Sequence, residues 1–285
     1  MIAQLSAALL AALQVAPAPQ MDTTLAVAVD GRLQIQNVLS GTVRIRTWDQ
    51  AKARIAVRAE AKDAVEIRYA EPVLSVRVRP EHLESDVPTD FEITIPRRMS
   101  IEASGVEMEL DIEGAGGTVA ASTVDGTVRV SGGRGTVALN AVEGGVTLTD
   151  TEGNIALNSV DGDVSVRRAR GVISIQAVDG GISLEEIDSG NVEVNTVDGD
   201  IVYRGTLRDD GRYFLSTHDG DISLAVPEGT NARVTVSTFS GELDAAFPIS
   251  VEGDVDGRRL SFTLGSGKAI VEVSTFDGLI RLVRP

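Results

Sequence analysis

Residues 136–144 read TVALNAVEG, residues 154–162 read NIALNSVDG, and residues 172–180 read VISIQAVDG. Each segment alternates apolar and polar residues and then ends on Val, an acid and Gly. Alternation with a period of two is typical of a β-strand, and an acid–Gly pair is typical of a tight turn. Equivalent positions recur with an 18-residue period, which indicates a structural repeat and decides the fold class.

Glycines recur at a nine-residue spacing in this part of the chain, so each 18-residue unit contains two strand-plus-turn segments. They fall at positions 117, 126, 135, 144, 153, 162, 171 and 180, slip by one position to 190 and 199, and resume at 211 and 220. A nine-residue segment holds a strand of about four or five residues and a turn. We expect an all-β, parallel β-solenoid, like a β-helix or β-roll, with 18-residue coils. An elongated antiparallel β-sandwich or meander is the alternative.

The apolar positions of the repeat predict its interior, because equivalent side chains of successive coils lie one above another. Positions 137/139, 155/157, 173/175 and 192/194 should form aliphatic ladders. Small residues fit where the coil bends, and amides beside them can stack between coils. The small residues are Thr123, Ala141, Ser159, Ala177 and Thr196, and their polar neighbours are Ser122, Asn140, Asn158, Gln176 and Asn195.

The charge of the chain divides it into two regions. Residues 21–100 hold 12 basic and 12 acidic side chains, whereas residues 101–285 hold 14 and 30 and so carry the whole net charge of −16. Residues 21–100 alternate apolar and polar positions, with Arg on the predicted solvent faces. We expect an N-terminal β-strand region at residues 21–100 that packs on or caps the solenoid domain at residues 101–285. This net charge disfavours nucleic acid and acidic membranes as partners.

One acid of each turn occupies the same position in successive coils, namely Asp125, Glu143, Asp161, Asp179, Asp198 and Asp219. Carboxylates about 4.8 Å apart repel by about 1 kcal/mol even in water. One interpretation is that this edge recruits cations, through weak Ca²⁺ binding or a basic partner surface. The other is that Asp-Gly is good turn chemistry and the charge confers solubility. The weak cation candidates are Asp161, Asp163, Asp198, Asp200, Asp219 and Asp221.

Several motifs argue against a catalytic or cofactor site. The chain has no Cys, which excludes thiolate metal sites and a cysteine nucleophile. Residues 265–269 read GSGKA and lack the first Gly and the Ser/Thr of a phosphate-binding loop, so they predict a turn. His82 and His218 have no partner in the sequence, and the single Trp48 predicts a core or capping residue. We expect no cofactor, no catalytic residue and no confident metal site.

The N-terminus predicts a signal peptide at residues 1–20. An Ala/Leu-rich run to Val15 precedes Ala16-Pro17-Ala18, where cleavage is expected. The alternative is a short apolar helix, since no Lys or Arg precedes the run. Because no later segment is long enough to span a bilayer, we expect a periplasmic, secreted or envelope-associated chain without an integral span.

The order of these elements resembles a known family. Leu33-x-Ile35-x-Asn37, Gly41-x-Val43-x-Ile45-x-x-Trp48-Asp49 and Phe91-x-Ile93-x-Ile95-Pro96 lead into Gly-x-Val/Ile repeats and a closing Ser274-Thr275-Phe276-Asp277-Gly278 strand. This pattern resembles the bacterial putative-adhesin family of β-strand-repeat proteins, an uncharacterised domain family. The resemblance implies an exported or envelope-associated β-solenoid without a defined catalytic site, and it supplies no binding residues.

Together, these patterns predict an exported, non-enzymatic β-solenoid that acts as an adhesin-like binding or scaffold protein of the bacterial cell envelope. The expected partner is an envelope protein or a glycan. Two alternatives stay open: a carbohydrate-active enzyme on the same scaffold, and an envelope-stress regulatory protein that binds a membrane partner.

Overall fold

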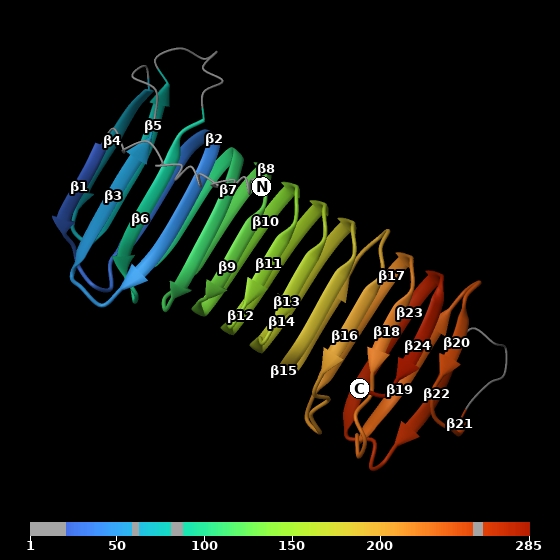
Figure 1. The fold of residues 1–285 in the computed structure, drawn as a ribbon. Helices are drawn as coiled ribbons and strands as arrows, with labels where there is room; N and C mark the ends of the chain where they lie inside the picture. Colours follow the sequence, from blue (N-terminus) through green and yellow to red (C-terminus); the bar gives the residue numbers. More distant parts are fainter. Residues whose placement is uncertain (1–20, 59–62, 81–87, 253–258) are drawn as a thin grey trace, which may run out of the picture.

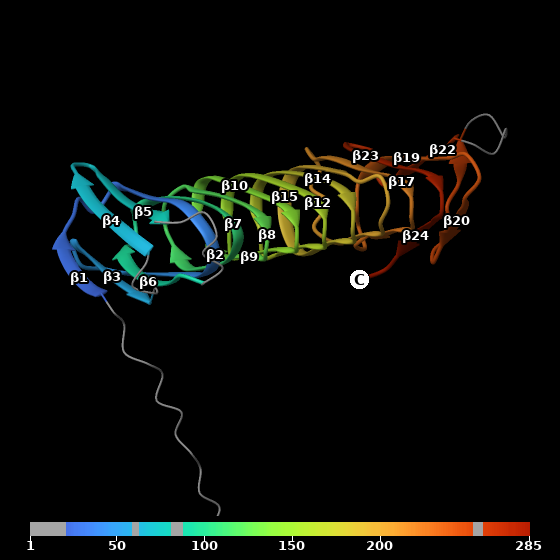
Figure 2. The ribbon, with the colours of Figure 1, turned by 90° about the horizontal axis from the view of Figure 1, so that it is seen from above.

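The computed structural model describes residues 21–58, 63–80, 88–252 and 259–285. Every regular element in these ranges is a β-strand, and the strands lie in two layers along an elongated molecule (Figures 1 and 2). The predicted signal peptide at residues 1–20 and His82 lie outside the described residues.

The strands fall into three groups along the molecule (Figure 1). The first end contains β1 (Met21–Ala26), β2 (Arg32–Trp48), β3 (Lys52–Arg58), β4 (Asp63–Ala70), β5 (Val73–Pro80), β6 (Asp90–Pro96) and β7 (Ser100–Ala115). The middle contains β8 (Val119–Asp125), β9 (Val128–Gly132), β10 (Arg134–Glu143), β11 (Val146–Thr149), β12 (Glu152–Asp161), β13 (Val164–Arg167), β14 (Arg170–Asp179), β15 (Ile182–Asn195) and β16 (Ile201–Gly205). The other end contains β17 (Arg212–Asp219), β18 (Ile222–Ala225), β19 (Ala232–Thr238), β20 (Glu242–Ala245), β21 (Val251–Glu252), β22 (Arg259–Leu264), β23 (Ala269–Asp277) and β24 (Leu279–Val283).

From β8 to β14 each coil contributes one strand to each layer, whereas β7 and β15 continue through a turn and pair in both layers. β10 pairs in parallel with β12, which places Val137 opposite Ile155, and β11 pairs in parallel with β13, which places Val146 opposite Val164. Both pairs of partners occupy equivalent positions of successive 18-residue units. The predicted parallel β-solenoid with 18-residue coils is therefore confirmed. The antiparallel alternative is wrong for the repeat, because successive coils run in the same direction.

The slip in the glycine spacing appears as a change of register between β14 and β15. Arg170 lies opposite Asp188, which keeps the 18-residue period, but Val172 lies opposite Asn191, one position beyond it. Residues 205–211 then lengthen the next coil, so that Asn191 lies opposite Arg212. The repeat absorbs both irregularities at its turns, and the strands on either side keep parallel pairing.

The order of the coils at each end differs from their order in the sequence. β2 lies between β7 and the coil formed by β5 and β6, and it pairs in parallel with all three strands. At the other end, β23 lies between β17 and β19, and β24 lies between β18 and β20. The next-to-last coil at each end therefore pairs with a segment distant in sequence; Arg212 lies opposite Ile270, for example.

Antiparallel strands lie beyond the last coil at each end. β4 pairs with β5, β3 pairs with β6 and β1 pairs with β3, while β22 pairs with β19 and β21 pairs with β22. Unpaired edges of a parallel stack would invite association with other chains, and these strands cover most of them. A single hydrophobic core runs from the strands of residues 21–100 through the repeat.

The interior of the repeat consists of the predicted aliphatic ladders, whose members are at most 2% exposed. The small residues before the turns are buried as well, and where they are Thr or Ser their hydroxyl groups bond to the turns. Thr217 Oγ1 donates to the carbonyl oxygen of Gly199 at 3.1 Å, and Thr275 Oγ1 donates to that of Gly220 at 3.1 Å. The outer polar ladder forms too, since Asn158 Nδ2 donates to Asn140 Oδ1 at 2.7 Å.

Candidate functional site

The turns that join the two layers on one side of the molecule carry a continuous row of acids. In-register pairing aligns the six predicted acids and extends the row to Glu107 at one end and to Asp277 of the closing Phe-Asp-Gly turn at the other. All of these side chains are exposed. We call this side, with its Val-acid-Gly turns, the Val–acid edge. Its acids are Glu107, Asp125, Glu143, Asp161, Asp179, Asp198, Asp219 and Asp277.

An apolar stripe runs beside these acids. The side chain immediately before each acid points outward. This follows because the side chain two positions before the acid points inward and side chains alternate along a strand. The apolar members are between 42% and 53% exposed. The sequence identifies these Val residues as part of the turns, and their exposure follows from their position directly after a buried residue in an alternating strand. The stripe consists of Val106, Val124, Val142, Val160, Val178 and Val197, followed by His218, Phe276 and Phe239.

The stripe ends in a stack of aromatic rings. The His218 ring lies 4.8 Å from the Phe276 ring, and the Phe276 ring lies 4.7 Å from the Phe239 ring, with interplanar angles of 12° and 7°. The order of the stack reflects the intercalation of β23 and β24, because the turn of Phe276 lies between those of His218 and Phe239. His218 is therefore a member of the stripe.

The second acid of the Asp-Gly-Asp turns has a structural partner in the next coil. Asp163 Oδ1 accepts the N–H of Gly181 at 2.8 Å, and Asp200 Oδ1 accepts the N–H of Asp221 at 2.8 Å. Asp221 accepts the N–H of Leu279 at 2.8 Å and a bond from Arg281 at 2.9 Å. These three candidates tie coils together.

The other three cation candidates, Asp161, Asp198 and Asp219, are exposed in the acid row. In the part of the chain that the structure describes, no group of three or more His, Asp or Glu side chains is arranged to hold a metal ion. Weak Ca²⁺ binding along the edge stays a prediction.

The opposite side of the molecule alternates the sign of its charges from coil to coil, and we call it the Arg–acid edge. Arg134, Glu152, Arg170 and Asp188 lie in one register row. Beside this row, Arg168 forms two bonds to Asp150, at 2.7 and 2.9 Å. The hydrogen bond from Arg168 holds the pKa of the Asp150 carboxyl below its usual value, and the positive charge adds to this effect.

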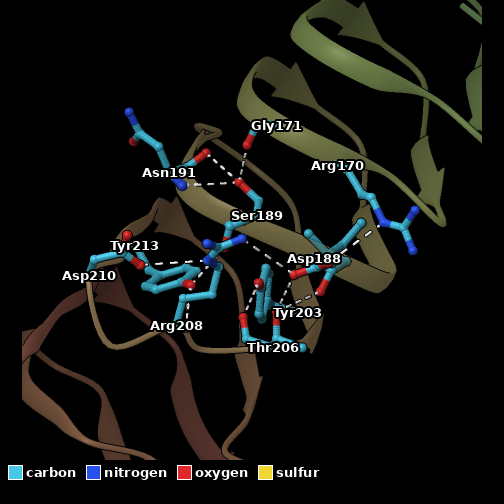
Figure 3. A network of polar contacts seen from close by, with 11 residues as sticks. Arg170, Gly171, Asp188, Ser189, Asn191, Tyr203, Thr206, Arg208, Asp210 and Tyr213 are labelled. Atoms are coloured by element: carbon cyan, nitrogen blue, oxygen red, sulfur yellow. Dashed lines mark hydrogen bonds and ion pairs between the residues drawn. The ribbon is translucent and has the colours of Figure 1, made fainter.

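The longest coil widens the Arg–acid edge and fills it with a polar network (Figure 3). Tyr213 donates its hydroxyl to the Ser189 carbonyl at 2.7 Å and accepts the N–H of Arg208 at 2.8 Å. Tyr203 packs edge-on against Tyr213, with ring centroids 5.9 Å apart. Burial raises the pKa of both tyrosines. Because both hydroxyls are bonded, this network stabilises the lengthened coil.

A shallow groove of about 290 Å³ lies on the outer face of β15, β17, β23 and β19. Phe214 lies in it with 37% of its surface exposed, between Glu193 of β15 and Glu272 of β23 in the same register row. The adjacent row is polar, with a hydrogen bond of 3.0 Å from Ser274 to Ser216. An aromatic ring flanked by carboxylates and hydroxyls is the chemistry that binds a sugar ring.

The structure shows the environment of the GSGKA segment at residues 265–269 and of the single tryptophan, Trp48. Residues 265–268 form the turn between β22 and β23, and Lys268 pairs with Asp209 at 3.0 Å, as expected for a turn. The prediction of a core position for Trp48 is wrong, because Trp48 is partly exposed; its indole N–H donates to the carbonyl oxygen of Lys52 at 2.7 Å. Nowhere in the described ranges is there a helix with the length and apolarity needed to cross a bilayer.

Comparison with known proteins gives a family and a distant structural likeness. The family model described as Toastrack DUF4097 matches residues 25–282. No curated protein matches the chain. Among solved structures, the chain is similar to a putative cell adhesion protein from Clostridium sporogenes ATCC 15579, at 13% identity over 93% of this chain and 99% of that one, with a TM-score of 0.26.

Proposed function

The chain belongs to the Toastrack DUF4097 family, and from this premise we propose that it is a non-enzymatic, adhesin-like binding or scaffold module of the cell envelope. The apolar stripe along the Val–acid edge is the observation that carries the proposal. Isolated exposed apolar side chains are ordinary on a soluble protein, whereas a contiguous exposed row is typical of an interaction surface.

The chemistry of the edge indicates the kind of partner. The stripe has nine members about 4.8 Å apart, so it extends over roughly 40 Å. The parallel row of acids attracts basic groups and disfavours a second copy of the same edge. A protein segment with an apolar face bordered by Lys or Arg complements both rows. We therefore place an envelope protein with such a segment first among the partners.

The same regularity supports a binding role over a catalytic one. Catalysis needs a few groups of different kinds that converge on one point. On the Val–acid edge, each coil repeats the groups of the coil before it, which suits an extended contact in which many weak contributions add together.

Capture from an envelope extract tests this proposal. The test variant replaces Val142, Val160 and Val178 with Thr, which keeps the β-branched shape and removes the apolar surface. The matched control is Val172→Thr, because Val172 is 44% exposed but lies outside the stripe. We expect the wild type and the control to capture the same protein partner, and the triple variant to lose it. Equal capture by the triple variant would contradict the proposal.

The groove at Phe214 favours a glycan as a second candidate partner. Binding of envelope oligosaccharides should be weakened by Phe214→Ala and unchanged by Ile270→Ala, since Ile270 is 40% exposed in the neighbouring row. Release of reducing sugar during the same incubation would favour the carbohydrate-active alternative, in which Glu193 and Glu272 are the paired acids.

Export is the remaining part of the proposal. The sequence of residues 1–20 supports it, with cleavage after Ala18. Cell fractionation followed by N-terminal sequencing tests it: a periplasmic, secreted or envelope-bound chain that begins at Pro19 is expected. An uncleaved chain in the cytoplasm would contradict export and leave the binding proposal to its own test.

A further inference from the structure

A hollow of about 440 Å³ lies on the Arg–acid edge, where the solenoid repeat begins. It is on the side of the molecule opposite the apolar stripe and is separate from it. Three arginines and one carboxylate line it, above a floor of small residues. We call it the arginine hollow, and its lining consists of Arg97, Arg98, Arg134, Asp150 and residues 114–116 and 131–133.

The lining of the hollow beneath the arginines is mostly glycine backbone. A Cβ on Gly132, whose φ is +95°, would overlap the carbonyl oxygen of Ala115. A Cβ on Gly116 would lie 2.9 Å from Cγ of Arg97. These glycines therefore let adjacent segments pack closely beneath the arginines, which come from two separate segments.

The charges in the hollow are unbalanced. Asp150, its one carboxylate, is already bonded twice by Arg168. Within the described residues, Arg97 forms one ion pair, with the highly exposed Asp49 at 3.5 Å, and Arg98 and Arg134 form none. In a chain with 42 acids, a cluster of three arginines that has a single ion pair within the described residues is unexpected.

Further along the same edge, the arginines are paired. Arg170 lies 3.6 Å from Asp188, and Arg167 lies 3.4 Å from Glu185. Glu152 is the register neighbour of Arg134, one strand away, but the two form no ion pair within 4.0 Å. The arginine hollow thus holds more positive than negative charge, in contrast to the paired arginines further along this edge.

An apolar shelf adjoins the arginine hollow. A second cavity of about 220 Å³ is lined by Val29, Trp48, Asp49 and Pro96, and it shares Arg97 and Arg98 with the hollow. A ligand with an anionic group and a small apolar or ring-shaped part would contact both cavities at once.

We propose that the arginine hollow binds a phosphate group, with the rest of a small phosphate ester on the shelf at Trp48. Guanidinium groups donate paired hydrogen bonds that match phosphate oxygens, and three of them around one space suit a doubly charged anion. The net charge of −16 repels long polyanions and anionic bilayers, so a small soluble ligand fits better than nucleic acid or a membrane surface.

Trp48 provides the measurement, because it is the single tryptophan and lines the shelf. The full chain is titrated with inorganic phosphate, with glycerol 3-phosphate, and with vesicles of phosphatidylglycerol or phosphatidylcholine, at constant ionic strength held with NaCl. Fluorescence and calorimetry follow binding. We expect a saturable response to phosphate and to the ester. A response to phosphatidylglycerol vesicles in place of the soluble ester would identify a lipid headgroup as the source of the same phosphate.

The test variant is Arg98→Gln with Arg134→Gln, and the matched control is Arg129→Gln. Arg129 is exposed, donates to Thr127 at 2.8 Å and lies outside the hollow. The double variant should bind phosphate about tenfold more weakly or worse, whereas the control should bind as the wild type does. All three side chains are exposed, and circular dichroism confirms that each variant is folded. No saturable response to any probe, or an equal response from the double variant, would overturn the proposal.

Discussion

Two adjacent glycines at one turn allow a controlled test of how tightly the coils are stacked. Gly180 has a φ of +124°, and a Cβ there would lie 2.6 Å from the carbonyl oxygen of Gly162 in the preceding coil. At Gly181, the nearest atom to an added Cβ is Asp163 Oδ1 at 3.4 Å, and the backbone is not left-handed. Gly180→Ala should therefore destabilise the protein strongly, whereas Gly181→Ala should not.

The magnitude follows from two contributions. A side chain in this region of φ costs about 1–3 kcal/mol. Relief of the overlap requires the two coils to move apart, which costs on the order of 1–3 kcal/mol more, as overpacking does. For a chain of this size, a total of about 3 kcal/mol lowers the melting temperature by roughly 6–12 °C. Gly181→Ala should shift the free energy of unfolding by less than about 1 kcal/mol, in the stabilising direction, because Ala restricts the unfolded chain.

Circular dichroism during heating and urea titration provides the measurement. The midpoints of the two variants are compared directly, because a solenoid need not unfold as a single unit. Melting temperatures for Gly180→Ala and Gly181→Ala that agree within about 2 °C, the effect of less than about 1 kcal/mol, would refute the close stacking inferred for this turn.

Four further outcomes are expected. Leu157→Ala should lower the free energy of unfolding by about 2–5 kcal/mol, because Leu157 is 1% exposed in the aliphatic ladder, and Val160→Ala should have a much smaller effect on the urea midpoint. Asp221→Ala should cost about 1–3 kcal/mol through loss of its bonds to Leu279 and Arg281, while Asp219→Ala in the exposed acid row should not lower the midpoint. Burial raises the pKa of the Tyr203 hydroxyl, so the unfolded chain loses this proton at a lower pH than the folded chain does. The free energy of unfolding should therefore fall as the pH rises above about 10, and the fall should be smaller in Tyr203→Phe. The urea midpoint measured against pH tests both outcomes. NaCl should raise the melting temperature by screening the acid row, and an unchanged or lower value would contradict repulsion along that edge.

The repeat itself could be predicted from the sequence, because in a parallel stack two residues that are one 18-residue period apart lie side by side in adjacent coils. Val137 and Ile155 are both apolar, lie one 18-residue period apart and are paired, and the slip at Gly190 appears in the structure as a change of register. The acid row followed from the same rule. Its extension to Glu107 could not be predicted, because Met108 stands where the other turns have Gly.

The ends of the solenoid could not be predicted in the same way. Arg212 of β17 and Ile270 of β23 are paired although β18 to β22 lie between them in the sequence, and no periodic signal connects the two segments. The arginine hollow has the same origin. Arg97 and Arg98 follow β6, whereas Arg134 begins β10, and they come together only because the turn after β7 lies between them.

The two edges of the solenoid together bear on why the acid row exists. Both edges place one residue per coil in a row about 4.8 Å apart. On the Arg–acid edge, the signs alternate from Arg134 to Glu152 to Arg170 to Asp188, so the spacing that would produce repulsion favours attraction. This fold therefore accommodates rows that avoid like charges. An Asn-Gly pair would fit the backbone conformation of the turn equally well, without a charge. Neither the coil geometry nor the turn chemistry requires eight acids in succession. The requirement for these acids must therefore come from the function of the Val–acid edge.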